Sequence, residues 1–182
     1  KPKLCAGEEK NVKLTYAEDF RNAFARVGIG VDTHAFGRAQ NYIVLGGVRV
    51  PSESGLVAHS DGDVLCHAVM DALLSAAGLK DIGHYFPDTD DEWKNADSMK
   101  MLAQVKALIR EQGFRPANLS AAIQAEKPRL AGYIEAIKKS LAEALNLPEK
   151  AVGISAGTNE KLGYIGEGKG ITVNAAVLLE KI

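Results

Sequence analysis

Segments with the apolar period of a β-strand alternate along this chain with segments that have the period of a helix. Strands are expected at residues 26–32, on both sides of Gly46–Gly47, and at 119–125, 151–156 and 171–179. Helices are expected at residues 61–77, 98–112 and 130–146, with Ser60 and Asp97 capping the first two. This alternation predicts an α/β (α+β) fold in which helices cover a small mixed β-sheet.

The length and composition favour one main domain. The chain has 182 residues, of which 46% are hydrophobic and 25% charged. A chain of this kind buries a sufficient core without disulfides or a structural metal. The apolar strand pattern begins at Arg26, so we expect a domain at residues 26–182 and a leader at 1–25. Within the leader, Thr15 and Glu18 fit a helix capping box.

The charge balance excludes two classes of partner. With 22 basic and 23 acidic residues the net charge is −1, which gives no electrostatic footprint for nucleic acid or an anionic membrane. No apolar run reaches the length of a membrane span, and the first residues lack a signal-peptide core. Cys5 and Cys66 form no CxxC pair, which favours a reducing compartment. We therefore expect a cytoplasmic protein.

Histidine and aspartate concentrate in one part of the chain, because all four histidines lie between His34 and His84. Asp32 and His34, placed at the end of the first strand, are two residues apart and project to one side. His67 lies inside the first helix, where a lone histidine ordinarily bonds a backbone carbonyl. The nearby Asp-x-His pair favours a metal instead. Two imidazoles and one carboxylate leave a coordination position open, which is typical of catalytic Zn²⁺.

Two further segments have the features of phosphate sites. His59 and Ser60 stand where a loop becomes a helix, and helix N-termini offer free N–H groups to anions. Ser60 also serves as a cap in this interpretation. The glycine-rich segment 157–170 contains Thr158, Glu160 and Lys161. It is either a hairpin loop or a site for a diphosphate with Mg²⁺, which prefers carboxylate and phosphate oxygens.

The acidic segment 81–91 is rich in turn residues and is either a solvated loop or a polyol site formed by Asp81, Ile82 and Gly83. Taken together, the residues indicate a divalent-metal enzyme that acts on a phosphorylated substrate.

Read in order, these segments closely resemble the 2-C-methyl-D-erythritol 2,4-cyclodiphosphate synthase family. The motifs that carry the resemblance are GIGVDTHAF, LGGVRVP, GLVAHSDGDVLCHAVMDALL, LKDIGHYFPDTD, ADSMKML and TNEKLGYIGEGKGI. The resemblance implies a homotrimer with active sites at the subunit interfaces. It also implies a phosphorus–oxygen lyase of the non-mevalonate isoprenoid pathway. Its substrate is a cytidine diphosphate derivative of methylerythritol phosphate, whose 2-phosphate attacks the β-phosphate and expels CMP.

The resemblance also assigns roles to residues of this sequence. It implies Zn²⁺ at Asp32, His34 and His67, Mg²⁺ (or Mn²⁺) at Glu160, and catalytic roles for His59 and Thr158, with Ser60 in the same segment. The erythritol-binding segment and the loop beside it match Asp81, Ile82, Gly83, Phe86, Pro87, Asp88, Thr89 and Asp90. The cytidine pocket and its surroundings, contributed by a neighbouring subunit, match Ala125, Pro128, Arg129, Leu130, Ala131, Gly157, Asn159, Lys161 and Tyr164.

The leader has a resemblance of its own. The segment LCAGEEKNVKLTYAEDFRNA is similar to the C-terminal end of a cytidylyltransferase of the same pathway, which predicts a fused bifunctional protein. A plain N-terminal extension or a cloning scar is the alternative. The leader lacks the Ser-rich, acid-poor composition of a transit peptide, so a bacterial cytoplasm is preferred to a plastid stroma.

One loop departs from the family pattern. Glu167 and Lys169 stand where an arginine and a glutamate are common, near the mouth of a central cavity in the trimer. Because Glu167 repels a diphosphate, we predict weak binding of isoprenoid diphosphates there. Two other functions remain open: an inactive metal-binding module of the same fold, and a zinc-dependent phosphohydrolase.

Overall fold

The computed structural model describes residues 25–182, so residues 1–24 of the leader, which include its capping box, lie outside the described residues. Five strands form one mixed sheet in the order β4-β1-β7-β5-β6. The strands are β1 (Arg26–Arg38), β4 (Gly55–Leu56), β5 (Phe114–Gln124), β6 (Val152–Gly157) and β7 (Gly170–Lys181). β5 and β6 are parallel, whereas β1 pairs antiparallel with both β4 and β7, and β7 antiparallel with β5. The predicted mixed sheet is confirmed.

The hairpin predicted around Gly46–Gly47 is also confirmed. It consists of β2 (Tyr42–Leu45) and β3 (Val48–Pro51), which form a separate two-stranded sheet. Both turn glycines have positive φ angles, of 58° and 77°, as a two-residue hairpin turn requires.

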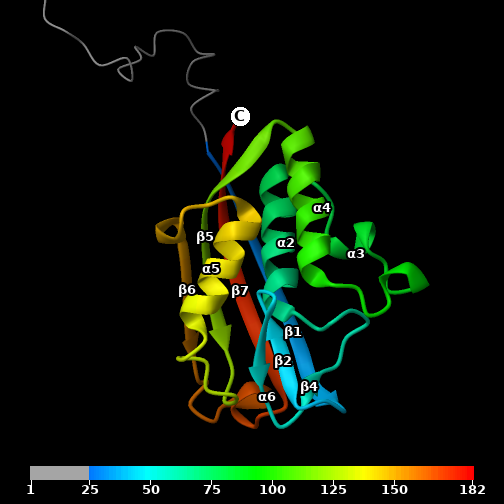
Figure 1. Cartoon of the computed structure of the whole chain (residues 1–182), viewed down its shortest axis with the longest axis vertical. Helices are drawn as coiled ribbons and strands as arrows, with labels where there is room; N and C mark the ends of the chain where they lie inside the picture. The colour runs from blue at the N-terminus through cyan, green and yellow to red at the C-terminus, as the bar shows by residue number, and fades with distance from the viewer. Residues whose placement is uncertain (1–24) are drawn as a thin grey trace, which may run out of the picture.

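Three long helices cover one face of the large sheet: α2 (Val64–Ala77), α4 (Ser98–Glu111) and α5 (Ile134–Leu145) (Figure 1). Short helical turns lie in the loops: α3 (Ile82–Tyr85), α6 (Gly163–Gly166), η1 (Asp91–Trp93) and η2 (Glu149–Ala151). The helices were predicted, but α2 and α5 begin three and four residues later than expected. The short turns were not predicted.

The predicted cap of α2 is wrong. The N-cap is Asp63, whose buried carboxylate accepts hydrogen bonds from the backbone N–H groups of Cys66, Gly46 and Gly47. Gly62, with φ at 81°, turns the chain just before the helix. Asp63 therefore both starts α2 and ties it to the hairpin turn, and Ser60 is left for another role.

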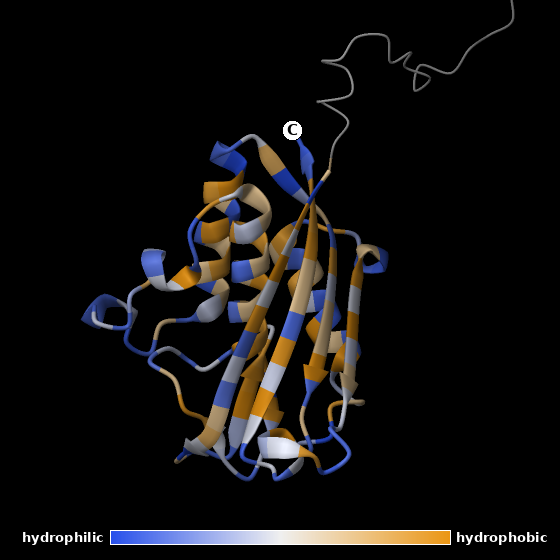
Figure 2. Ribbon diagram, turned by 180° about the vertical axis from the view of Figure 1, so that it is seen from behind, coloured by the Kyte–Doolittle hydropathy of each residue, from blue (hydrophilic) through white to orange (hydrophobic). Residues whose placement is uncertain are grey.

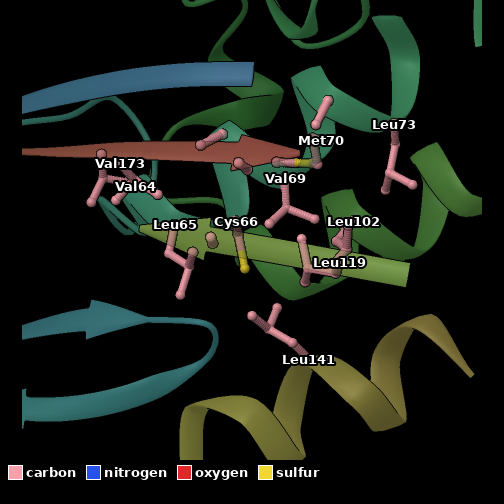
Figure 3. Close-up of a cluster of buried hydrophobic side chains, with 14 of the residues drawn as sticks. Val64, Leu65, Cys66, Val69, Met70, Leu73, Leu102, Leu119, Leu141 and Val173 are labelled. Atoms are coloured by element: carbon pink, nitrogen blue, oxygen red, sulfur yellow. The ribbon is translucent and has the colours of Figure 1, made fainter. Parts of the chain in front are cut away.

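α2 is the central element of the core. Its side chains pack against β5, β7, α4 and α5 through residues such as Leu119, Val173, Leu102 and Leu141 (Figure 3). Of its 14 residues, 11 are buried, so α2 is enclosed on almost all sides.

On its sheet side, α2 approaches β1 so closely that a side chain cannot fit between them. A Cβ on Gly28 would overlap the carbonyl oxygen of Ala72, and a Cβ on Gly30 that of Ala68. Gly28 and Gly30 share a strand face with Asp32, because side chains alternate along β1. The glycines therefore bring Asp32 and His34 against the first turns of α2.

Replacing Gly30 with alanine is expected to lower the free energy of unfolding by about 3 kcal/mol, because backbone atoms cannot move aside as a side-chain end would. Urea denaturation measures this loss. Gly132→Ala is the matched control, since a Cβ there meets nothing within 4 Å and should change stability little. Equal stability of the two variants would contradict the close approach.

Candidate metal centre and substrate cavity

Asp32 and His34 from β1 meet His67 from α2. The Nδ1 atoms of His67 and His34 lie 3.1 Å and 3.3 Å from Oδ2 of Asp32. One ligand atom from each residue lies within 4.8 Å of the other two, and no other group of this kind was found in residues 25–182. The sequence placed the Asp-x-His pair at the end of a strand, whereas β1 continues to Arg38.

The donor set fits a divalent cation. Nε2 of His34 is buried and has no hydrogen-bond partner among the described atoms. A buried, unpartnered imidazole nitrogen is costly unless something binds it. One carboxylate and two imidazoles are ligands that zinc accepts, and they leave a fourth position free.

The electrostatics of the group follow from its pairing. Burial disfavours the Asp32 carboxylate, but hydrogen bonds and charge interactions with His34 and His67 outweigh it and hold the pKa of Asp32 well below its ordinary value. Burial disfavours protonated His34, yet the bond to Asp32 prevails and raises the pKa of His34. The site therefore favours a positive charge next to Asp32.

The far side of the His67 ring is also bonded. Its Nε2 lies 3.1 Å from the hydroxyl of Ser60 and 3.1 Å from that of Ser98, the first residue of α4. Ser98 in turn donates to Asp61, 2.5 Å away. Neither Ser98 nor Asp61 was among the predicted site residues, because their positions in the sequence carry no spacing signal that links them to His67.

A cavity of about 310 Å³ opens beside the metal group. Eight of the predicted site residues line this cavity, namely His34, His59, Ser60, His67, Ile82, Gly83, Phe86 and Asp88. The cavity therefore joins the expected metal, phosphate and polyol residues in one space.

The acidic segment is partly helical rather than an open loop. Asp81 caps α3 by accepting from the N–H of His84, and the N–H of Ile82 donates to Asp71. Further along, Pro87 and Thr89 precede Asp90, whose side chain caps η1 and whose carbonyl lies 3.4 Å from Nε2 of His59.

Asp71, which accepts the N–H of Ile82 in the cavity wall, offers a test of the electrostatics of this region. Burial, with the nearby carboxylates of Asp81 and Asp32, raises its pKa although the Ile82 N–H opposes the shift. Because the pKa of Asp71 is higher in the folded protein than in the unfolded chain, the free energy of unfolding falls as the pH rises from the unfolded-state pKa through the folded-state pKa. Metal-free Asp71→Asn is therefore expected to exceed the wild type in melting temperature at pH 7 and to match it near pH 3. A wild type that is the more stable at pH 7 would contradict this account.

The remaining predicted residues form a second group. Oε1 of Glu126 accepts the backbone N–H groups of Asn159 and Lys161, which joins the loop at 125–131 to the loop at 157–161. Thr158 donates to Glu160 at 3.1 Å. The 310 Å³ cavity is not lined by any of the predicted residues from these two loops or by Tyr164; these residues are Ala125, Pro128, Arg129, Leu130, Ala131, Gly157, Thr158, Asn159, Glu160, Lys161 and Tyr164.

Further side chains of the glycine-rich segment are also paired. The hydroxyl of Tyr164 lies 2.6 Å from the hydroxyl of Thr172, a residue of β7 that is paired with Thr33 of β1. Glu167 forms an exposed ion pair with Lys169, so its charge is partly neutralised within the loop.

A five-stranded mixed sheet packed under three helices, with an Asp–His–His group beside a cavity, defines a class of small α/β protein with a candidate metal centre. Residues 25–180 match the YgbB family, and the chain belongs to this family. It is 50% identical to a Synechococcus sp. (strain JA-3-3Ab) protein over 154 residues, which are 85% of this chain and 98% of the relative. It is 51% identical to a Nitrosococcus oceani protein over 154 residues, 85% and 97% of the two chains. Both relatives are named 2-C-methyl-D-erythritol 2,4-cyclodiphosphate synthase.

Two solved structures are similar. The bifunctional IspDF from Campylobacter jejuni has a TM-score of 0.84 and 40% identity, covering 98% of this chain and 50% of that one. A CDP-bound form of 2C-methyl-D-erythritol-2,4-cyclodiphosphate synthase has a TM-score of 0.78 and 35% identity, covering 85% and 100%. This chain thus spans half the length of the bifunctional protein.

The predicted activity is confirmed. The chain is an enzyme, a phosphorus–oxygen lyase that forms 2-C-methyl-D-erythritol 2,4-cyclodiphosphate in the non-mevalonate isoprenoid pathway. Over residues 25–182, the structure contains no helix long and apolar enough to cross a membrane.

Proposed function

We propose that the reaction takes place where the cavity meets Asp32, His34 and His67. The substrate is 4-diphosphocytidyl-2-C-methyl-D-erythritol 2-phosphate. An oxygen of its 2-phosphate bonds to the β-phosphorus, the bond from that phosphorus to the α–β bridging oxygen breaks, and CMP leaves with the bridging oxygen. The observation that carries this proposal is the unpartnered, buried Nε2 of His34 beside Asp32 and His67.

The residues of the group would hold zinc, which when bound supplies Lewis-acid neutralisation of charge on the β-phosphate. Asp32, His34 and His67 come from two packed elements of the core, so their positions are fixed before the substrate arrives. Because the nucleophile belongs to the substrate, orientation of its two ends accounts for most of the rate.

His59 and Thr158 steady the reacting phosphates, with Ser60 beside the metal group. Among residues 25–182, the imidazole of His59 has one weak partner, the carbonyl of Asp90 at 3.4 Å, so it is available to an anion. The exposed carboxylate of Glu160 would hold Mg²⁺ (or Mn²⁺), which is commonly bound by one or two carboxylates plus substrate phosphates.

The methylerythritol part binds to the segment Asp81–Gly83 and the adjacent loop Phe86–Asp90. This proposal is supported by the presence of Ile82, Gly83, Phe86 and Asp88 in the cavity wall. The cytidine part binds to the loops at 125–131 and 157–161 with Tyr164. In support, Glu126 joins these loops through two backbone hydrogen bonds.

A homotrimer with sites at its interfaces completes the proposal. The sheet face away from the long helices is open in a single chain (Figure 2). On it the side chains of Val27, Ile29 and Val31 are 67%, 66% and 54% exposed. Adjacent exposed apolar residues of this kind mark protein contact surfaces. The absence of residues 125–131 and 157–161 from the cavity wall also favours a site shared between subunits.

We further propose that residues 1–25 belong to a preceding cytidylyltransferase domain and that the protein acts in a bacterial cytoplasm. The resemblance of the leader and the 98% coverage by the bifunctional C. jejuni structure support the fusion. The native gene decides it: a nucleotidyltransferase frame upstream supports fusion, and a start codon near Lys1 excludes it.

Phosphorus-31 NMR of the protein with the proposed substrate, Mg²⁺ and Zn²⁺, repeated after zinc removal, tests the proposed chemistry. CMP and a cyclic diphosphate that both depend on zinc would support it. Open-chain phosphates would instead indicate hydrolysis. No turnover by the folded, zinc-loaded protein would indicate an inactive module or a need for the cytidylyltransferase domain.

A further inference from the structure

A chain of hydrogen bonds runs away from the metal group into the protein. Nε2 of His67 lies 3.1 Å from the hydroxyl oxygen of Ser98, and that hydroxyl lies 2.5 Å from Oδ1 of Asp61. The backbone N–H of Ser98 donates to Oδ2 of the same carboxylate at 3.1 Å, and the N–H of Asp63 donates to Oδ1 at 3.2 Å. Asp61 is thus held in place by two backbone groups.

The direction of each bond in this chain is fixed by chemistry. A carboxylate accepts hydrogen bonds and donates none, so the Ser98 hydroxyl must give its single proton to Asp61. Its oxygen can then only accept from His67. Ser98 is 0% exposed, so no solvent competes for that oxygen. It follows that Nε2 of His67 carries a proton, so that Nδ1, which faces Asp32, is the ring nitrogen left to bind a metal.

This tautomer is the one that the metal group needs. Nδ1 of His67 faces Asp32, whereas Nε2 faces the two serines. The hydroxyl of Ser60 is also 3.1 Å from Nε2, but among the described atoms it has no acidic partner that fixes the direction of its proton. Ser98 is therefore the residue that determines the outcome.

We infer that Ser98, oriented by Asp61, is a positioning residue that sets the tautomer and ring orientation of His67 for metal binding. The inference rests on the proposed Asp32–His34–His67 site. Partners of this kind behind a ligating histidine fix its tautomer and raise its basicity, and their loss typically weakens metal affinity ten- to a hundredfold.

The first test measures zinc affinity of the full chain by competition with a chelator. Ser98→Ala removes only the hydroxyl, because the backbone N–H still bonds Asp61 and Asp97 still caps α4. We expect its affinity for Zn²⁺ to fall by about tenfold. Asp97→Ala is the matched control: it weakens the same helix terminus without touching His67, and its affinity should equal that of the wild type.

The second test reads the tautomer directly, by NMR of ¹⁵N-labelled histidine in the metal-free protein. The His67 signals are identified by their absence in His67→Ala. We expect a proton fixed on Nε2 in the wild type. In Ser98→Ala we expect a mixture of tautomers, because the carboxylate of Asp32 then competes for the proton at Nδ1. A merely structural role for Ser98 would leave this signature unchanged.

The outcomes separate the inference from the proposal beneath it. If His67→Ala abolishes zinc binding while Ser98→Ala keeps both wild-type affinity and the Nε2–H tautomer, the role of Ser98 is refuted and the metal site stands. If His67→Ala itself retains wild-type affinity, the proposed site fails and the inference fails with it. Lower affinity and a mixed tautomer in Ser98→Ala, with a normal Asp97→Ala, support the inference.

Discussion

Replacing His67 with alanine is expected to abolish stoichiometric zinc binding and to lower kcat/KM by about a thousandfold or more, which is about 4 kcal/mol of transition-state stabilisation. The reason is that Asp32 and His34 alone leave too few ligands, and both come from the same strand. Zinc content by metal analysis and CMP release measure the two effects.

His84→Ala is the matched control for this change. His84 is exposed on α3 and does not line the cavity, and its ring contact within the described part of the chain is edge-to-face with Tyr85. Its activity and zinc content should stay close to those of the wild type. Full zinc occupancy and full activity in His67→Ala would show that the metal, if one is bound, lies elsewhere.

Much of this site could be predicted from the sequence because it depends on local geometry. Asp32 and His34 share a face of β1 for the same reason that any residues two apart do in a strand. His67 lies on the next long helix, α2, which packs against β1. The structure brings the three together as the sequence predicted.

Other parts of the site depend on contacts that no local pattern encodes. In the sequence, Gly28 and Gly30 look like glycines of an ordinary strand. The reason for them appears only when α2 is packed against β1, because a side chain would not fit between the two elements. Likewise Ser98 reaches His67 from a helix that begins 31 residues later. The strand order β4-β1-β7-β5-β6 is set by long-range pairing, which hydrophobic periodicity does not specify.

The cap of α2 illustrates how one contact changes a residue's role. Ser60 and Asp63 both suit an N-cap by residue type. Asp63 takes the position because its carboxylate also satisfies the two amides of the hairpin turn. This leaves Ser60 turned toward His67, which agrees better with the metal site than with capping.

The second large effect is expected from mixing two inactive variants. His67→Ala disables the metal group, and Glu160→Ala disables the second group, which lies outside the cavity in the same chain. If neighbouring subunits of a cyclic trimer each supply one group, a trimer with both variants has one intact site among three. Trimers selected by a different tag on each variant should therefore show about one third of wild-type activity.

The control is a pair of variants that damage the same group, His34→Ala with His67→Ala. No arrangement of these subunits restores an Asp–His–His group, so their mixed trimers should stay inactive. Activity in the first mixture and none in the second would require sites built from two subunits. Two inactive mixtures would mean that both groups act within one chain, and residues 157–161 would then have to close over the cavity of their own subunit during the reaction.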